Sequence, residues 1–195
     1  MVRHARRAVG PRRLAVHPRP GRAPRGEDPG LSRLSALPRL AGFLARHPLV
    51  RRDPIGAAAR LLRWQAVARR GGTLEPAWVD GPAGTVRLRL RRGLSSATAC
   101  WYAGLTDPAE MGFVLQALRP GDRMADVGAN VGVYAALAAG ATGARVLALE
   151  PAAETLPDLR AMLALNGIGD RVEVRAIAAG AAPGSLRFTT GRGTT

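Results

Sequence analysis

Several residue types are scarce in this chain of 195 residues, and each scarcity excludes a class of protein. The single cysteine, Cys100, rules out an internal disulfide and a cysteine-based zinc site, and no metal centre is expected. No stretch approaches the ~18–20 consecutive apolar residues of a membrane-spanning helix. The arginine pairs near the N-terminus have no apolar segment behind them, so no secretory signal is expected either. We therefore expect a cytoplasmic protein without a transmembrane segment.

Lysine is absent, so all 29 basic residues are arginine, and the net charge is +15. Residues 1–70 hold 17 arginines against three acidic residues, whereas residues 71–195 hold 12 against 11. Together with heavy use of Ala, Gly and Pro, this composition favours a GC-rich coding sequence over selection for phosphate binding. Basic segments do bind phosphates non-specifically, but aromatic residues make up only 4% of the chain. No specific nucleic-acid partner is expected.

Composition divides the chain into three segments. Residues 1–30 are rich in Arg, Pro and Gly and nearly free of large apolar side chains, so burial cannot offset their ordering entropy. We expect a disordered basic N-terminal segment, although an over-extended gene start explains it equally well. Residues 31–104 predict a helical and β-strand extension. Its basic amphipathic helices, one of them beginning at Asp53-Pro54, favour packing on the following domain over a membrane-surface role.

Within this extension, residues 73–103 predict strands. Thr85–Leu90 alternates apolar residues with arginine, which is typical of a strand with one face in water. Cys100 is expected to be a half-buried strand residue. Asp107-Pro108 then predicts a helix through Leu118, with Asp107 as its cap and Glu110 completing a capping box.

Residues 105–195 predict the N-terminal half of an α/β cofactor domain. Strands and helices alternate: after the strand near Met124 we expect a helix over Val131–Ala139, a strand over Arg145–Leu149, a helix over Ala152–Leu165, a strand over Val172–Ile177 and a strand-like piece over Ser185–Thr189. Such alternation predicts a parallel, right-handed, doubly wound sheet. Only three core strands are present, where a complete domain of this type has six or seven, so an incomplete Rossmann-like sheet is expected.

The most informative stretch is Met124–Tyr134, which is followed by Glu150 at the end of the next apolar strand. An apolar strand, a glycine turn, a helix and a second strand ending in an acid are how a nucleotide-like cofactor is held at a sheet edge. Gly128 permits a sharp turn close to a ligand, and Gly132 permits close packing of the next helix on the strand. Glu150 can accept hydrogen bonds from the ribose hydroxyls of any adenosine cofactor.

Two residues of the same stretch separate one adenosine cofactor from another. Asp126 favours a cationic ligand such as S-adenosylmethionine and disfavours a pyrophosphate. Asn130 replaces the middle glycine of the dinucleotide fingerprint, where its side chain would obstruct a pyrophosphate on the helix N-terminus. The pattern therefore favours S-adenosylmethionine over NAD.

The chain resembles the FkbM-type methyltransferases. The matching motifs are Asp126–Gly132, Ala148–Pro151, Leu165–Ile168, Arg171–Val174, Gly184–Phe188 and Leu118–Asp122. The resemblance implies a class I methyltransferase fold and S-adenosylmethionine-dependent methylation, generally on oxygen, of a small molecule or glycan. It assigns cofactor binding to Asp126, Gly128, Asn130, Gly132 and Glu150, with Glu110 as a weaker candidate. Family members continue into a strand with an Asp-Val-Glu-Gly-like motif and further strands of the acceptor pocket, which this chain does not contain.

No catalytic residue can be named from the sequence. The three histidines, His4, His17 and His47, all lie outside the region that carries the motifs, and His47 before Pro48 is typical of a helix end. Two alternatives stay open: a dinucleotide-dependent oxidoreductase or epimerase, and a non-catalytic module that binds nucleic acid or an anionic membrane through its basic helices.

Overall fold

The computed structural model describes residues 40–182, 184 and 185. The chain divides into two units, Met1–Arg39 and Leu40–Thr195, and the description below concerns the second. The segment 1–30 lies outside the described residues, as does nearly all of the strand-like piece expected over 185–189. Expectations for those residues stay predictions.

The second unit begins with three helical segments, and the third of them starts where the sequence predicts. Residues 40–46 are helical, α2 spans Pro48–Arg52 and α3 spans Pro54–Arg69. The carboxylate of Asp53 accepts a hydrogen bond from the Gly56 N–H at 2.9 Å, which caps α3 as expected. Trp64, 5% exposed, anchors α3 in the main hydrophobic core.

The segment expected to be all strand is half hairpin and half helix. β1 (Ala77–Gly81) and β2 (Gly84–Arg87) form an antiparallel hairpin. Val86 and Leu88 are fully buried while Arg87 is exposed, so the predicted alternation is confirmed. The strand prediction for Cys100 is wrong, because α4 spans Ser95–Ala103 and Cys100 is fully buried in it. Small residues at every third position let this helix pack closely: Ala97, Cys100 and Ala103.

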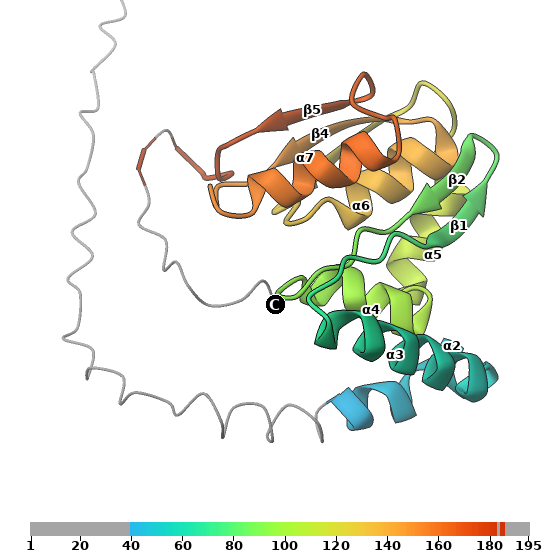
Figure 1. The fold of residues 1–195 in the computed structure, drawn as a ribbon. Helices are drawn as coiled ribbons and strands as arrows, with labels where there is room; N and C mark the ends of the chain where they lie inside the picture. Colours follow the sequence, from blue (N-terminus) through green and yellow to red (C-terminus); the bar gives the residue numbers. More distant parts are fainter. Residues whose placement is uncertain (1–39, 183, 186–195) are drawn as a thin grey trace, which may run out of the picture. The chain divides into compact units, whose positions relative to one another are not determined.

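The α/β class and the parallel order of the strands are confirmed. After α5 (Pro108–Ala117), three parallel strands lie side by side in the order β3 (Arg123–Val127), β4 (Arg145–Leu149) and β5 (Val172–Arg175) (Figure 1). Asp126 pairs with Ala148, which pairs with Val174. The carboxyl ends of β3 and β4 therefore lie together, with the motif loop and Glu150 just beyond them.

The helices that connect the strands begin at other residues than expected. The first is α6 (Val133–Ala136), which continues as the π-helix η1 (Leu137–Thr142), in place of a single helix over Val131–Ala139. The hydroxyl of Thr142 donates to the Ala138 carbonyl at 2.7 Å, within this last turn. The second helix, α7 (Leu156–Leu165), starts four residues later than expected, and the Ala152 N–H before it donates to the Glu150 carboxylate at 2.8 Å.

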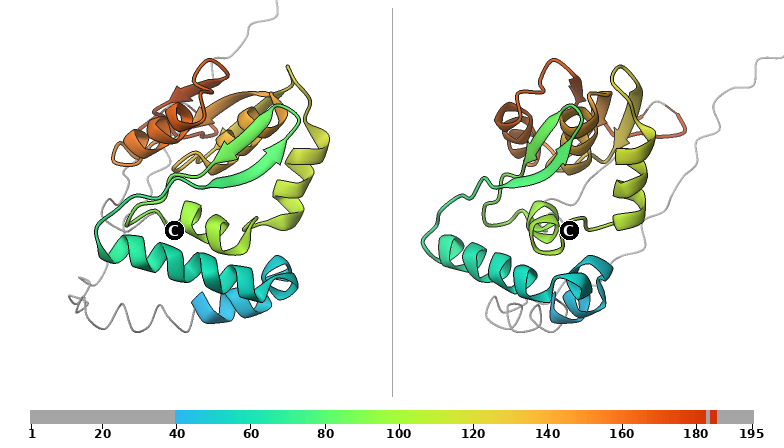
Figure 2. Two further views of the ribbon diagram at one scale, coloured as in Figure 1. Left: turned by 45° about the vertical axis from the view of Figure 1, so that its right-hand side comes forward. Right: turned by 90° about the vertical axis from the view of Figure 1, so that its right-hand side faces the viewer.

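The views in Figures 1 and 2 place the sheet at one end of this unit and α2 and α3 at the other. The β1–β2 hairpin packs on η1, and α6 packs against α7. One face of the sheet, the face that carries Ala125, Val127 and Glu173, is open among the described residues. Ala125 and Glu173 are exposed, and Val127 is 61% exposed. Parallel sheets are usually covered on both faces.

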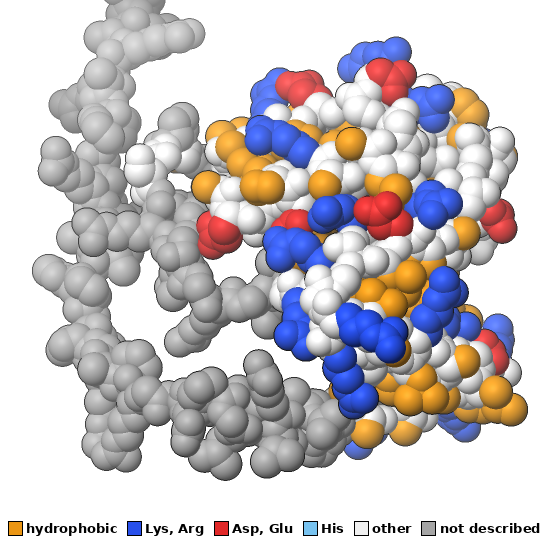
Figure 3. Space-filling view, viewed as in Figure 1, with side chains coloured by type: hydrophobic (Ala, Val, Ile, Leu, Met, Phe, Trp, Pro, Cys, Tyr) orange, Lys and Arg blue, Asp and Glu red, His pale blue; other side chains and the backbone are white. Residues whose placement is uncertain are grey.

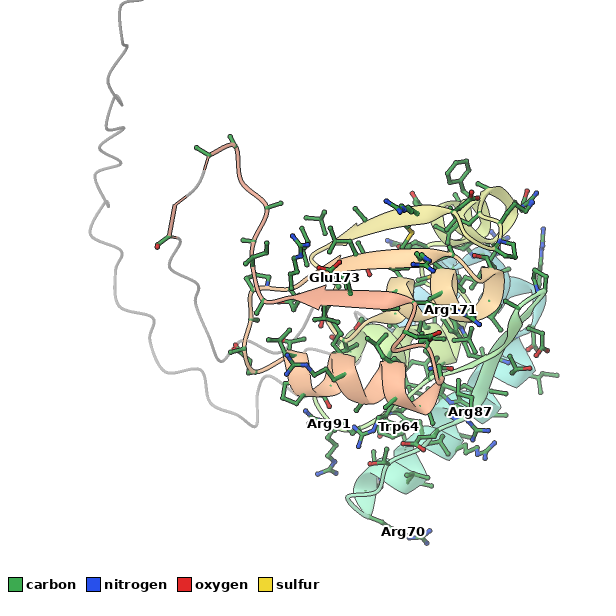
Figure 4. The ribbon with its side chains drawn as sticks, turned by 90° about the horizontal axis from the view of Figure 1, so that it is seen from above. Trp64, Arg70, Arg87, Arg91, Arg171 and Glu173 are labelled. Atoms are coloured by element: carbon green, nitrogen blue, oxygen red, sulfur yellow. The ribbon has the colours of Figure 1, made fainter. Side chains whose placement is uncertain are left out.

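Polar contacts join the hairpin segment to α7 through Arg87 and Arg91, two residues that Figure 4 labels. Arg91 Nε donates to Asp158 Oδ1 at 2.6 Å, and Arg89 Nη1 lies 3.4 Å from the same oxygen. At the other end of α7, the side chain of Asn166 accepts from the Arg87 N–H at 2.7 Å and donates to the Arg87 carbonyl at 3.0 Å. Asn166 thus satisfies the backbone of β2 as a neighbouring strand would.

Candidate cofactor site

The loop after β3 winds through three residues in the left-handed region: Gly128 (φ 81°), Asn130 (φ 51°) and Gly132 (φ 81°). A β-carbon at position 128 would meet no atom within 4 Å, so the space beside this backbone is open. A β-carbon at position 132 would lie 3.4 Å from Leu159 Cγ, so the close packing at Gly132 is against α7 and not against the strand as predicted.

Glu150, 7% exposed, holds this loop in place. Its Oε2 accepts from the Asn130 N–H at 2.7 Å and its Oε1 accepts from the Ala152 N–H at 2.8 Å. The N–H groups of Gly128 and Ala129 also donate to the Leu149 carbonyl, at 2.8 and 3.0 Å. Because an ionised carboxylate has about four acceptor sites, Glu150 retains capacity for further donors.

Asp126 carries a side-chain oxygen with no partner. Its Oδ2 is buried and accepts no hydrogen bond from the described residues, and Asn130 Oδ1 is in the same condition. Burial raises the pKa of Asp126 to about 6, with a smaller contribution in the same direction from the charge of Glu150; a hydrogen bond from the Ala135 backbone opposes the shift. Buried polar atoms are normally paired, so we expect both atoms to accept hydrogen bonds from a group outside the described residues.

Both unpaired atoms belong to residues that line a cavity of about 180 Å³. Its lining comprises Ser96, Cys100, Thr106, Asp107, Met111, Asp126, Gly128, Ala129, Asn130, Val133 and Tyr134. Two of these side chains are carboxylates and none is basic, although the chain has a net charge of +15. Arginine side chains are spread over both the upper and lower parts of the face in Figure 3. The lining of the cavity is therefore acidic, whereas the protein as a whole is basic.

A further part of the lining, the α4 wall, comes from α4 and the segment that follows it. Thr106 Oγ1 lies 2.8 Å from Cys100 Sγ, and the Thr106 carbonyl lies 3.1 Å from His47 Nε2. Asp107 makes no side-chain cap on α5, contrary to the prediction, because its carboxylate accepts from the Tyr134 hydroxyl at 3.3 Å. Burial raises the pKa of Tyr134 to about 12, and the nearby charge of Asp107 adds to the shift.

The structure brings Asp126, Gly128 and Asn130 to the cavity, whereas Gly132 and Glu150 support the loop from outside its lining. Glu110 is exposed in the first turn of α5 and does not line the cavity. His4 and His17 lie outside the described residues, and His47 is the buried N-cap of α2. The α4 wall was not predicted, because residues 95–103 were expected to form a strand and form α4 instead. The three-residue spacing of Ala97, Cys100 and Ala103 was the signal that could have indicated a helix.

A second groove, of about 640 Å³, lies at the amino ends of the strands. It is larger, but Arg123, Arg145 and Arg171 line it and no residue of the Asp126–Gly132 loop does. We therefore place the candidate site at the smaller cavity, where the loop, the unpaired acceptors and the glycines meet. Across the described residues, no three His, Cys, Asp or Glu side chains gather as a metal site would require, and no helix has the length and apolar character to cross a membrane.

No sequence model of a known family matches the chain, and no curated protein matches it. Solved structures with partial likeness include P. horikoshii TYW2 in complex with MeSAdo, at 14% identity and a TM-score of 0.41, covering 71% of this chain and 53% of that one. Geranyl diphosphate C-methyltransferase from Streptomyces coelicolor A3(2), in complex with Mg2+, geranyl diphosphate and S-adenosyl-L-homocysteine, has 19% identity and a TM-score of 0.35, covering 64% and 48%. The chain spans about half the length of these proteins, and likeness at this level carries no argument about activity.

Proposed function

We propose that this chain is the cofactor-binding part of an S-adenosylmethionine-dependent methyltransferase. The observation that carries the proposal is the acidic cavity at the carboxyl end of β3, where Asp126 Oδ2 and Asn130 Oδ1 are buried without donors. A ligand with N–H donors and positive charge satisfies both atoms, and S-adenosylmethionine has an ammonium group and a sulfonium. A pyrophosphate offers only acceptors and negative charge to these two atoms.

Different residues of the site bind different parts of the ligand. Asp126 and Asn130 receive the ammonium group, and the remaining acceptor sites of Glu150 suit the ribose hydroxyls. Gly128, with no side chain and open space beside it, lets the ligand lie against the backbone. When bound, the cofactor supplies a methyl group electrophilic enough for direct in-line displacement, so the chain's main contribution is alignment.

The finer assignment follows the motifs. The resemblance of Asp126–Gly132 and Ala148–Pro151 to the FkbM-type enzymes supports methylation on oxygen, with a small molecule or a glycan as acceptor. No residue of the cavity is assigned as a base. Burial raises the pKa of the Cys100 thiol and takes that of Tyr134 to about 12, so neither group is ionised at neutral pH.

Isothermal titration calorimetry on the chain tests the proposal. We expect S-adenosylmethionine to bind and NAD not to bind, and Asp126→Ala to weaken binding about tenfold or more through loss of a charge-assisted hydrogen bond. Glu154→Ala is the matched control, because Glu154 is exposed just beyond Glu150. Absence of S-adenosylmethionine binding would overturn the proposal. Binding of NAD in its place would favour the oxidoreductase or epimerase alternative.

A further inference from the structure

The α4 wall of the cavity carries a third unpaired atom. Ser96 Oγ is buried and has no hydrogen-bond partner among the described residues. The other two hydroxyl groups of the lining are engaged: that of Thr106 contacts Cys100 Sγ, and that of Tyr134 donates to Asp107. Ser96 is therefore the one lining hydroxyl, within the described part of the chain, whose proton is free to be donated.

The three unpaired atoms differ in what they can do. Asp126 Oδ2, as an ionised carboxylate oxygen, and Asn130 Oδ1 are acceptors, whereas a serine hydroxyl can donate. A ligand group that offers donors to Asp126 and Asn130 and an acceptor to Ser96 satisfies all three atoms. The α-amino acid group meets this requirement, because its ammonium donates and its carboxylate accepts.

The lining of the cavity also indicates one end of a ligand. The cavity, of about 180 Å³, has space for an amino acid group. Glu150, to which we assign the ribose, lies outside the lining. The adenosine end then lies beyond the cavity, and the amino acid end lies within it.

The position of Ser96 suits an anionic group. It is the second residue of α4, whose N-cap, Leu94, makes no side-chain cap. The first turn of a helix carries partial positive charge that favours an anion. The wall is also anchored before any ligand binds: the Tyr102 carbonyl accepts from Arg60, the Gly104 carbonyl from Trp78 Nε1, and Trp101 Nε1 donates to the Arg60 carbonyl.

We propose that the Ser96 hydroxyl binds the carboxylate of the cofactor's amino acid end, which makes α4 a part of the binding site. This inference rests on the proposed function and adds to it a residue that selects for the carboxylate. The consequence is specificity: the site distinguishes S-adenosylmethionine from an analogue that keeps the ammonium and the sulfonium but lacks the carboxylate.

Calorimetry with three probes tests the inference: S-adenosylmethionine, S-adenosylhomocysteine and decarboxylated S-adenosylmethionine. We expect Ser96→Ala to weaken binding of the first two about tenfold, since each loses a hydrogen bond to a charged group. Binding of the decarboxylated probe should change less than about twofold, because it has no carboxylate to lose. Ser95→Ala is the control, since Ser95 is exposed in the same helical turn.

Three results would overturn the inference. Equal losses for all three probes would show that Ser96 affects the shape of the cavity and not the carboxylate. Unchanged affinity of Ser96→Ala, with native thermal unfolding, would show that the hydroxyl makes no contact. If the unaltered chain binds none of the probes, the proposed function fails as well, so failure of the function and failure of the Ser96 role are distinguishable.

Discussion

The backbone N–H of Asn130 donates to Oε2 of Glu150 at 2.7 Å and so joins the loop after β3 to the residue that follows β4. The same carboxylate accepts from the Ala152 N–H at 2.8 Å through its other oxygen. Glu150 therefore orders the loop that carries the unpaired acceptors. In the function that we propose, its remaining acceptor sites bind the ribose hydroxyls.

Glu150→Ala should destabilise the chain even without a ligand. The substitution removes the acceptor of two backbone N–H groups, and hydrogen bonds to a charged group contribute about 1.5–3 kcal/mol each. We expect the free energy of unfolding in urea to fall by about 3 kcal/mol, and Glu150→Gln to cost less because its carbonyl oxygen still accepts one bond. Glu154→Ala, at an exposed position, should match the unaltered chain. A Glu150→Ala variant as stable as the unaltered chain would contradict this role.

Asp126 should make stability fall as pH rises. Its folded-state pKa of about 6 lies above the usual 3.8, so its contribution is fully present below about pH 4 and is lost as pH rises through 6. The loss is at most about 3 kcal/mol, by 1.36 kcal/mol per pKa unit. Urea unfolding between pH 4 and 7 should show this fall, and Asp126→Asn should lack it. Parallel curves for the two proteins would contradict the shift, and exposed Asp170→Asn serves as control.

The same titration should govern ligand binding with the opposite sign. A protonated Asp126 carries no charge to attract the ammonium group, so affinity for S-adenosylmethionine should rise as pH increases through about 6. We expect calorimetry at pH 5 and pH 7 to differ by about tenfold, the worth of one strong charged contact. Asp126→Asn should give the same affinity at both pH values. A pH-independent affinity of the unaltered chain would exclude Asp126 as the ammonium partner.

Asn166→Ala should loosen the attachment of the hairpin to α7. The amide of Asn166 makes three hydrogen bonds, two with the Arg87 backbone and one to the Met162 carbonyl at 2.9 Å. Because Arg87 is exposed and water replaces part of the loss, we expect a decrease of about 2 kcal/mol in the free energy of unfolding. Gln116→Ala, an exposed amide at the end of α5, should change it little. Equal effects of the two substitutions would contradict a specific role for Asn166.

Two Gly→Ala substitutions should have opposite effects on the melting temperature. A β-carbon at Gly81 would lie 2.3 Å from the Ala141 carbonyl oxygen, so Gly81→Ala would force the hairpin away from η1 at a cost of about 1–3 kcal/mol. At Gly112, within α5, a β-carbon would meet nothing within 4 Å. Gly112→Ala should therefore stabilise the helix by about 0.5–1 kcal/mol. Stabilisation by both substitutions would show that the hairpin does not pack tightly on η1.

The elements with a strong local pattern could be predicted from the sequence. The apolar run of β4 has the predicted ends, Arg145 and Leu149, and Asp53-Pro54 starts α3 as expected. The strand prediction for residues 95–103 is wrong because their small side chains are compatible with a strand or a helix, and packing against the core selected the helix. The prediction that Asp107 caps α5 is wrong for a related reason, since the Tyr134 hydroxyl, 27 positions away, donates to the same carboxylate.

By itself, the sequence determined which residues form the loop. Gly128 and Gly132 mark positions of positive φ, and their places at the ends of apolar strands made Asp126 and Glu150 candidate site residues. These properties depend on neighbours along the chain. Only the tertiary structure decided that α4 faces this loop, that Ser96, Asp126 and Asn130 line one cavity, and that no arginine lines it. Such facts depend on contacts between segments far apart in sequence, which local spacing does not encode.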